Sequence, residues 1–187
     1  MSIVVGVDEV GRGCWAGPLV VAAVILDKRI RGLKDSKLLT RAQREALSLK
    51  VHKSAVAIGI SWIAPAEVDR LGLTEATRQA SHDAVAQLGC DYDQIIMDGN
   101  YNYLSTNPKA VTLIKADNLV PAVSAASIVA KVARDQYMRD IAKQFPQYQF
   151  DKHVGYGTRL HREMLKLHGA CELHRLSWRP FRNDVEL

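Results

Sequence analysis

Five short runs of apolar, mostly β-branched residues constrain the fold of this 187-residue chain more than any other feature of its sequence. Each run is shorter than a typical helix and is bounded by turn or polar residues, as buried strands are. The first two runs follow one another directly and the later ones alternate with helical patterns. This order predicts an α/β fold in which one mixed β-sheet is flanked by helices. The predicted strands lie at residues 3–7, 19–26, 55–63, 94–97 and 111–114.

The segments between these runs carry helical signals. Thr40 is a typical N-cap residue, and Pro65 suits a first helical turn. Gly89 stands where a glycine often ends a helix, and Pro146 stops an alanine-rich helix. The predicted helices lie at residues 40–51, 65–70, 74–88, 121–145 and 159–168.

The composition is that of an ordinary globular protein, with 48% hydrophobic and 24% charged residues. Lys and Arg number 25 against 20 Asp and Glu, which gives a formal net charge of +5. A positive excess favours a polyanionic partner, because basic side chains release counterions from phosphates. The residues after 145 are polar, aromatic and basic. We therefore expect an α/β body over residues 1–145 and a small helical segment over residues 146–187 that packs on the same domain.

The cysteines and the apolar runs indicate the compartment. Cys14, Cys90 and Cys171 are odd in number, lie far apart and have no zinc-knuckle spacing. They predict reduced thiols and a cytoplasmic protein. The longest apolar run, residues 19–26, is far too short to cross a bilayer, so no membrane is expected as a partner.

Two adjacent acids, Asp8 and Glu9, follow the first apolar run and precede Gly11, Arg12 and Gly13. Acids are poorly placed inside a buried strand, so we expect the strand to end and the chain to turn where they stand. Glycine permits such a turn and lets a ligand approach the backbone. Two carboxylates at a strand end favour a hard cation, and an arginine beside them favours an anion such as phosphate. The alternative is a plain polar turn.

Two further acids occupy similar positions. Asp98 follows an apolar run and precedes Gly99, whereas Asp117 follows the last predicted strand just before the long helix. Ligands collect at strand ends in an open α/β sheet, so these acids are expected to meet Asp8 and Glu9. Clustered carboxylates repel one another unless a cation neutralises them, and an oxygen-only site suits Mg²⁺ or Mn²⁺. The alternatives are a turn at Asp98 and a helix cap at Asp117.

Two other kinds of site fit the sequence poorly. Zinc favours histidine and cysteine ligands, yet the six histidines include no HExxH motif. His161 and His168 are instead predicted to share one exposed helix face. Gly11, Gly13 and Gly17 loosely resemble a dinucleotide-binding loop, but a strand follows them where that motif needs a helix.

Seven short motifs lie in order along nearly the whole chain. They are residues 7–13 (VDEVGRG), 16–18 (AGP), 35–37 (DSK), 97–100 (MDGN), 115–117 (KAD), 124–128 with 130–135 (SAASI and AKVARD) and 155–158 (GYGT). Together they resemble the motifs of ribonuclease HII, the bacterial type 2 ribonuclease H family. Two departures are small: Cys14 and Trp15 stand where the family often has Pro-Leu, and Ala116 stands where glycine is usual.

The resemblance implies a ribonuclease H-like fold with a C-terminal helical extension. It also implies an endonuclease that cleaves the RNA strand of RNA–DNA hybrids and cuts at ribonucleotides embedded in duplex DNA, leaving 3′-hydroxyl and 5′-phosphate ends. By the same resemblance two Mg²⁺ or Mn²⁺ ions serve catalysis, and the chain is expected to act as a monomer. The catalytic, metal-binding acids implied are Asp8, Glu9, Asp98 and, as the fourth acid, Asp117.

The resemblance also implies substrate contacts. Gly11, Arg12 and Gly13 are expected to reach the ribose 2′-hydroxyl, the group that distinguishes RNA from DNA. Tyr156 is expected to stack on the sugar at the junction of RNA and DNA. Without the resemblance, Tyr156 reads as an ordinary, partly buried tyrosine. Phosphate and strand contacts are expected from Ser36, Lys37, Ser124 and Lys131, and Asn100 is expected to contact the substrate. The alternatives are a loop lysine, a buried helix serine and a solvated helix lysine.

Three other functions share some of these signals. A junction resolvase also uses clustered acids, but the Gly-Arg-Gly and Gly-Tyr-Gly motifs disfavour it. A non-catalytic nucleic-acid-binding module shares the positive charge, but the presence of all four acids disfavours a degenerate site. A metal-dependent phosphatase shares the acids, and the basic, aromatic C-terminal segment disfavours it.

Overall fold

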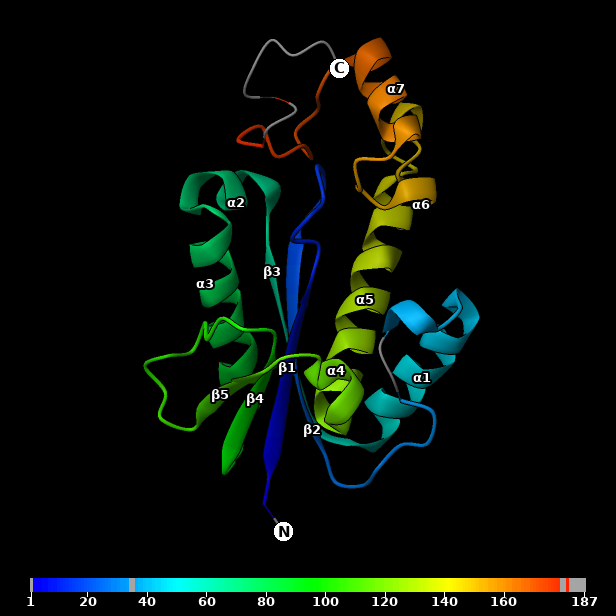
Figure 1. Cartoon of the computed structure of the whole chain (residues 1–187). Helices are drawn as coiled ribbons and strands as arrows, with labels where there is room; N and C mark the ends of the chain where they lie inside the picture. The colour runs from blue at the N-terminus through cyan, green and yellow to red at the C-terminus, as the bar shows by residue number, and fades with distance from the viewer. Residues whose placement is uncertain (1, 34–35, 179–180, 182–187) are drawn as a thin grey trace.

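The structure, a computed structural model, describes residues 2–33, 36–178 and 181, so Asp35 of the DSK motif lies outside it. The described residues form a five-stranded sheet in the order β3-β2-β1-β4-β5, with helices on both faces (Figure 1). This arrangement confirms the predicted α/β fold with a mixed sheet. The strands are β1 (Val4–Val10), β2 (Leu19–Leu26), β3 (Ala55–Ile63), β4 (Gln94–Asp98) and β5 (Ala110–Leu113).

The central strand β1 runs further than predicted, and two acids lie inside it. β1 pairs with the antiparallel strand β2 as far as Val10, whereas its parallel pairing with β4 stops at Val7. Asp8 and Glu9 therefore continue the strand with a neighbour on one side only. The expectation that the chain turns at these acids is wrong, because hydrogen bonds to β2 keep the backbone extended. Because the pairing with β4 stops before Asp8 and Glu9, space is left beside the carboxyl groups of these two acids.

The helices begin close to their predicted residues, but the longest ends early. The Thr40 side chain accepts from the amide of Gln43, and the Gln43 side chain accepts from the amide of Thr40, which confirms Thr40 as the N-cap. The alanine-rich helix ends at Ile141, because turns replace helix before Pro146, which disfavours helical backbone at the residue before it. The helices are α1 (Arg41–Ser54), α2 (Pro65–Leu71), α3 (Leu73–Ala86), α4 (Ala116–Leu119), α5 (Pro121–Ile141), α6 (Phe150–His153) and α7 (Arg159–His168), with 3₁₀ turns η1 (Ser36–Leu38) and η2 (Pro146–Tyr148).

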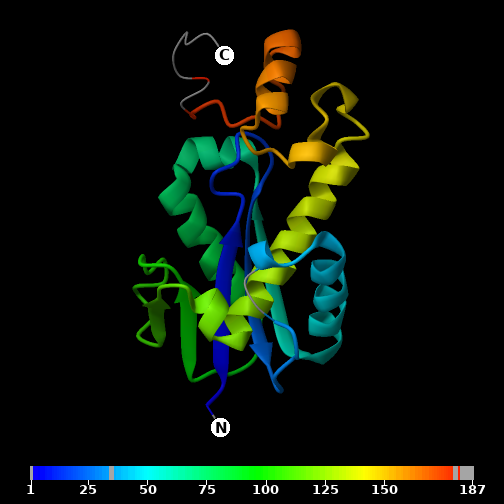
Figure 2. The same ribbon diagram turned by 45° about the vertical axis from the view of Figure 1, so that its right-hand side comes forward.

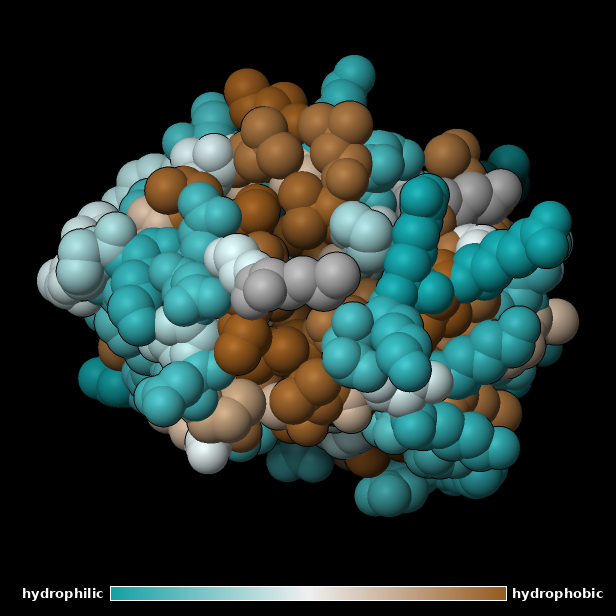
Figure 3. Space-filling model, turned by 90° about the horizontal axis from the view of Figure 1, so that it is seen from below, coloured by the Kyte–Doolittle hydropathy of each residue, from teal (hydrophilic) through white to brown (hydrophobic). Residues whose placement is uncertain are grey.

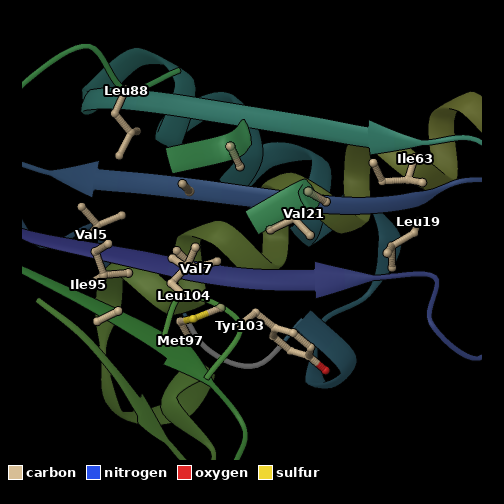
Figure 4. Close-up of a cluster of buried hydrophobic side chains, with 14 of the residues drawn as sticks. Val5, Val7, Leu19, Val21, Ile63, Leu88, Ile95, Met97, Tyr103 and Leu104 are labelled. Atoms are coloured by element: carbon tan, nitrogen blue, oxygen red, sulfur yellow. The ribbon is translucent and has the colours of Figure 1, made fainter. Parts of the chain in front are cut away.

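A hydrophobic core fills the space between one face of the sheet and helices α2 and α3 (Figure 4). Val5 and Val7 of β1 point into this core. Because side chains alternate along a strand, Glu9 lies on the same face beyond the core, and Asp8 lies on the opposite face. The side chains of these two neighbouring acids therefore lie on opposite faces of the sheet, near the end of β1.

Helix α5 packs on the other face of the sheet, beside α1 (Figure 1). Small residues of α5, among them Ala125 and Ala126, contact the valines of β2. Gly6 of β1 permits a close approach, because a Cβ there would lie 2.1 Å from the backbone of Ala122. The middle of α5 therefore lies beside the end of β1, on the face of the sheet that carries the Asp8 side chain.

Beyond α5 the chain folds back over the end of β1 as η2, α6 and α7 (Figure 2). Isolated β-bridges join Cys14 to Tyr156 and Ala16 to His174. Phe150 lies fully buried in a further apolar cluster that includes Ala16 and residues of α5 and α7. The C-terminal segment thus packs directly on the loop that follows β1.

His161 of α7 is fully buried, which corrects the prediction that it shares an exposed face with His168. Its Nδ1 lies 2.9 Å from the carbonyl oxygen of Tyr156, and its Nε2 lies 3.1 Å from Nε2 of His174. Burial lowers the pKa of His161 and of His174 to about 4, so both rings are neutral at neutral pH. The prediction therefore fails at His161, which belongs to an internal hydrogen-bonded layer, whereas His168 is exposed.

The end of the molecule where the chain begins carries exposed apolar residues (Figure 3). Seen from below, it shows a band of apolar residues bordered by hydrophilic ones (Figure 3). A hollow of about 260 Å³ lies beside the start of β1 and the end of β2, next to Val4 and Leu26. Among the described residues, no helix combines the length and the apolar character needed to cross a membrane.

Candidate active site

A cavity of about 440 Å³ opens where β1 and β4 end, beside the middle of α5. Asp8, Glu9 and Asp98 all line it, so the structure brings together three of the four predicted acids. Side chains from the loop after β1, from η1 and from α5 complete its wall. The lining residues are Asp8, Glu9, Val10, Gly11, Arg12, Gly13, Ser36, Lys37, Asp98, Ser127, Lys131 and Tyr156.

Short contacts orient the three acids. Oδ1 of Asp8 accepts a hydrogen bond from the amide of Glu9 at 2.8 Å. Oδ1 of Asp98 accepts from the amide of Ala116 at 2.7 Å. Oε1 of Glu9 pairs with the guanidinium of Arg12 at 3.2 Å. The carboxylates are therefore held in place by their own backbone and by one arginine before any ligand binds.

Burial and repulsion make the charged forms of two of these acids costly. Burial, and then the charge of Glu9, raises the pKa of Asp8 well above its ordinary value, and Asp98 adds to the repulsion. A hydrogen bond from Ser127 partly offsets this rise. Burial also raises the pKa of Glu9, although Arg12 opposes the shift. A fold that buries like charges in this way suits a cation, which reverses the local electrostatics.

The donor set at this position fits a hard divalent cation. Carboxylate oxygens are the ligands that Mg²⁺ and Mn²⁺ prefer, and Asp8, Glu9 and Asp98 face one cavity. Within the described part of the chain, no three His, Cys, Asp or Glu side chains form a ready-made metal-binding group. A Mg²⁺ site of one or two carboxylates completed by water and substrate phosphate needs no more protein ligands than these.

Asp117, the fourth predicted acid, lies in a short helix and not at a strand end. Helix α4 begins after Lys115, whose φ of 59° turns the chain sharply after β5. Asp117 is buried, its Oδ1 accepts from the side-chain amide of Asn118 at 3.1 Å, and it is not part of the cavity wall. Its neighbour Ala116 holds Asp98. Asp117 thus lies next to the acid cluster through α4, and its direct role stays a prediction.

Two predicted substrate contacts also lie outside the cavity wall. Ser124 is buried in α5, and its hydroxyl donates to the carbonyl oxygen of Asp117 at 2.6 Å. This bond ties α4 to the start of α5. Asn100 is exposed in the loop after β4.

Ser127 lines the cavity, although sequence reasoning did not select it. Its hydroxyl oxygen lies 3.0 Å from that of Ser36, within hydrogen-bond distance, and its hydrogen bond to Asp8 lowers the pKa of that acid. Both Ser36 and Lys37 of η1 line the cavity as well. The sequence did carry one signal for Ser127. It stands three residues after Ser124 in an alanine-rich helix, and residues at this spacing share a helix face.

Tyr156 and Lys131 form another part of the wall. The ammonium of Lys131 lies 5.4 Å from the centre of the Tyr156 ring and pairs with Asp135 at 2.9 Å. Tyr156 is 38% exposed, and burial of the rest raises its pKa to about 12, so its hydroxyl stays protonated at neutral pH. The cavity therefore presents an aromatic face and a positive charge side by side.

The two glycines after β1 are required for different reasons. Gly11 has a φ of 92°, and a Cβ there would lie 2.5 Å from Nε of Arg134, so the fold itself demands glycine. A Cβ on Gly13 would meet nothing within 4 Å. Open space for a close ligand is therefore found at Gly13. At Gly11 the internal packing explains the residue.

Similarity to known proteins agrees with this geometry. A family model described as Ribonuclease HII matches residues 5–180. A ribonuclease HII of Bacillus mycoides is 41% identical over 188 aligned positions, which cover 100% of this chain and 72% of that protein. The chain belongs to the ribonuclease HII family. A ribonuclease HII of Bacillus thuringiensis is 40% identical with the same coverage. The chain is accordingly a ribonuclease H, an endonuclease that acts on RNA–DNA hybrids.

Solved structures share the fold and confirm its ribonuclease H-like class. Ribonuclease H2 of Pyrococcus horikoshii has a TM-score of 0.82 and 28% identity, covering 96% of this chain and 95% of its own. Ribonuclease HII of Archaeoglobus fulgidus, solved in complex with PCNA, has a TM-score of 0.80 and 25% identity, covering 98% of both chains. The ribonuclease HIII named Bst-RNase HIII, solved with Mn²⁺, shares the fold with a TM-score of 0.75 and 20% identity, covering 97% of this chain and 68% of its own.

Proposed function

We propose that this ribonuclease H cuts at single ribonucleotides embedded in duplex DNA as well as within RNA–DNA hybrids, and that it uses two divalent metal ions. The convergence of Asp8, Glu9 and Asp98 on one cavity carries the proposal. Acids alone suit many enzymes that act on phosphates. Lys131 and Tyr156 in the same wall favour a polynucleotide, whose backbone is anionic and whose bases and sugars stack on aromatic rings.

The ions would be held by Asp8, Glu9 and Asp98, with Asp117 as the fourth acid beside them. When bound, Mg²⁺ or Mn²⁺ activates a water and stabilises the leaving oxygen of a phosphodiester. The raised pKa values of Asp8 and Glu9 support a cation at this position. The Mn²⁺ bound to the ribonuclease HIII neighbour supports the same class of ion.

The protein's own residues bind and orient the strand to be cut. Lys37 and Lys131 are placed to meet backbone phosphates, since both line the cavity. The hydrogen bond between Ser36 and Ser127 joins η1 to α5 and so keeps these lysines on one surface. The exposed face of Tyr156 stacks on the sugar at the junction of RNA and DNA. Ser124 contributes indirectly, because its hydroxyl bonds the carbonyl oxygen of Asp117 in α4. Asn100, exposed in the loop after β4, is the remaining proposed substrate contact.

Selection of RNA is assigned to the segment from Gly11 to Gly13. The backbone of this segment lines the cavity beside the acids, and Gly13 has no neighbour where a side chain would stand. A ribose 2′-hydroxyl can therefore come within hydrogen-bond distance of the main chain. This contact would place the ribonucleotide, and not a deoxynucleotide, at the acids.

The test is cleavage of end-labelled duplex DNA that carries one ribonucleotide, with Mg²⁺ and Mn²⁺ added separately. We expect one cut beside the ribonucleotide with 3′-hydroxyl and 5′-phosphate ends, and no cut without metal. An all-DNA duplex and a four-way junction of the same sequences are the controls. Cleavage of the junction without cleavage at the ribonucleotide would refute the proposal and favour a resolvase.

We also propose that the chain acts as a monomer in the cytoplasm. Three separate free thiols, of which Cys14 is buried, support a reducing compartment. The PCNA complex belongs to the archaeal relative. Light scattering at the concentrations used for cleavage gives the mass directly, and a dimer mass would refute the monomer.

A further inference from the structure

Two fully buried arginines lie behind the segment from Gly11 to Gly13. Arg134 comes from α5 and Arg175 from the chain beyond α7, and each is 0% exposed. Their hydrogen-bond partners within the described structure are all backbone carbonyl oxygens. Burial of a guanidinium without a carboxylate costs free energy. So costly an arrangement suggests a purpose beyond packing.

Arg175 binds the loop after β1 through its whole guanidinium group. One terminal nitrogen donates to the carbonyl oxygens of Gly11 at 2.7 Å and Arg12 at 3.3 Å. The other terminal nitrogen and Nε donate to the carbonyl oxygen of Gly17 at 2.8 and 3.1 Å. Only a planar fork of five N–H groups makes all four bonds, because the ammonium of lysine has three donors on one atom.

These bonds determine where the neighbouring amides point. In a trans peptide the carbonyl of one residue and the N–H of the next point in opposite directions, and the described peptides are all trans. The carbonyl groups of Gly11 and Arg12 point inward to Arg175. The N–H groups of Arg12 and Gly13 therefore point outward, on the side of the cavity that both residues line.

The two outward amides are available to a ligand. No described residue accepts a hydrogen bond from the amide of Arg12 or of Gly13. At Gly13 no side chain covers the backbone, and a Cβ would meet nothing within 4 Å. Two adjacent donors thus face the cavity beside Glu9 without a protein partner.

We propose that Arg175 is a positioning residue for RNA selection, because it orients the amides of Arg12 and Gly13 toward the 2′-oxygen of the ribose at the cut site. The inference rests on the proposed function. A deoxyribose lacks this oxygen and leaves the two donors desolvated and unpaired, which is how a site rejects an analogue without a hydroxyl.

The first test compares Arg175→Lys with Arg134→Lys, which also shortens a buried arginine but leaves the carbonyl groups of Gly11 and Arg12 bound. Single-turnover cleavage with Mg²⁺ is measured on duplexes that carry either a ribonucleotide or a 2′-fluoro nucleotide at one position. We expect Arg175→Lys to lower the ratio of the two rates at least about ten-fold. We expect Arg134→Lys to keep that ratio even where both rates fall. An unchanged ratio in Arg175→Lys would overturn the inference.

The second test needs neither cleavage nor a folded variant. Amide resonances of Arg12 and Gly13 are followed by NMR in the unaltered protein without divalent metal. A duplex with one ribonucleotide is expected to shift them more than the matching all-DNA duplex does. Equal shifts with both duplexes contradict the inference, whatever the cleavage assay shows. If the shifts depend on the ribonucleotide but the cleavage assay with metal shows no cut, that result counts against the proposed function alone.

Discussion

At the scale of single residues, Asp8 shows a conflict between stability and function. Its side chain is half-buried next to Glu9 and Asp98, and desolvation and repulsion raise its pKa. Each unit by which a carboxyl pKa is raised corresponds to about 1.4 kcal/mol against the charged form in the folded state. A site that needs clustered acids for chemistry is therefore expected to destabilise the metal-free protein.

Asp8→Asn is expected to stabilise the metal-free protein at pH 7. A carboxyl whose pKa is raised on folding binds its proton more tightly in the folded than in the unfolded state, so its ionisation lowers stability as the pH rises above about 4. The gain from asparagine should thus be about 1 kcal/mol or more at pH 7 and should vanish near pH 4. Urea unfolding in EDTA at both pH values measures it. Asp27→Asn, at a side chain that is 67% exposed, is the matched control. A loss of stability at pH 7 in Asp8→Asn would contradict the account.

The two glycines after β1 should respond differently to alanine. Gly11→Ala should destabilise the protein by more than about 1 kcal/mol, because φ is positive and Arg134 occupies the space. Gly13→Ala should change stability by less than about 0.5 kcal/mol, since nothing lies near its Cβ. Gly13→Ala should nevertheless lower cleavage at a ribonucleotide, because the methyl group blocks the approach. Thermal unfolding and single-turnover cleavage of both variants test this, and unimpaired cleavage by Gly13→Ala would count against it.

At the scale of elements, patterns within one segment were predictive. β2 and β3 match their predicted bounds, and α7 begins and ends as predicted. Alternation and end signals are local properties, so they are visible in the sequence. The division of the chain at residues 145 and 146 stays a prediction.

Features set by a neighbouring element were not predicted. β1 continues through Asp8 and Glu9 because β2 pairs with it there. Helix α4 is a single turn that carries no sequence signal, and it separates Asp117 from the strand that precedes it. Ser127 and Arg175 were missed for the same reason, since their partners lie far away in the sequence. The convergence of Asp8, Glu9 and Asp98 was predictable, because strand ends in such a sheet share one edge.

The buried histidine layer around α7 predicts how stability depends on pH. The pKa of His161 and of His174 is about 4 in the folded protein, below the ordinary 6.5 of the unfolded chain. The unfolded state therefore binds more protons between pH 4 and 6.5, so the stabilisation is complete above about 6.5 and is lost as the pH falls toward 4. His174→Gln should reduce this slope, and His82→Gln, at an exposed position, should not. Urea unfolding from pH 4 to 7.5 measures the slopes, and an unchanged slope in His174→Gln would contradict the assignment.

At the scale of the whole molecule, two distant parts of the chain build one site. The acids come from the sheet, whereas the carbonyl-binding Arg175 and the aromatic Tyr156 come from the C-terminal segment. The loop after β1 lies between them, and the β-bridge from Cys14 to Tyr156 joins the two parts. In the proposed function, cleavage and RNA selection would both depend on this contact between the body and the C-terminal segment.

Divalent metal should stabilise the whole molecule. A ligand that binds only the folded state raises its stability, so Mn²⁺ is expected to raise the melting temperature of the unaltered protein. Asp8→Asn should show a smaller rise, because it lacks one proposed ligand. Calorimetry over a Mn²⁺ titration measures both, with Asp27→Asn as the control. Equal rises in Asp8→Asn and the control would place the ion elsewhere.

Asp8, Glu9 and Asp98 are proposed to form a metal-dependent site for cutting RNA. Cleavage of an RNA–DNA hybrid by Asp8→Asn, compared with Asp27→Asn at saturating Mg²⁺, tests this site most directly. We expect Asp8→Asn to lose at least about two orders of magnitude in rate while it still binds the hybrid, and Asp27→Asn to cut like the unaltered protein. Undiminished, Mg²⁺-dependent cleavage by Asp8→Asn would contradict the proposed site.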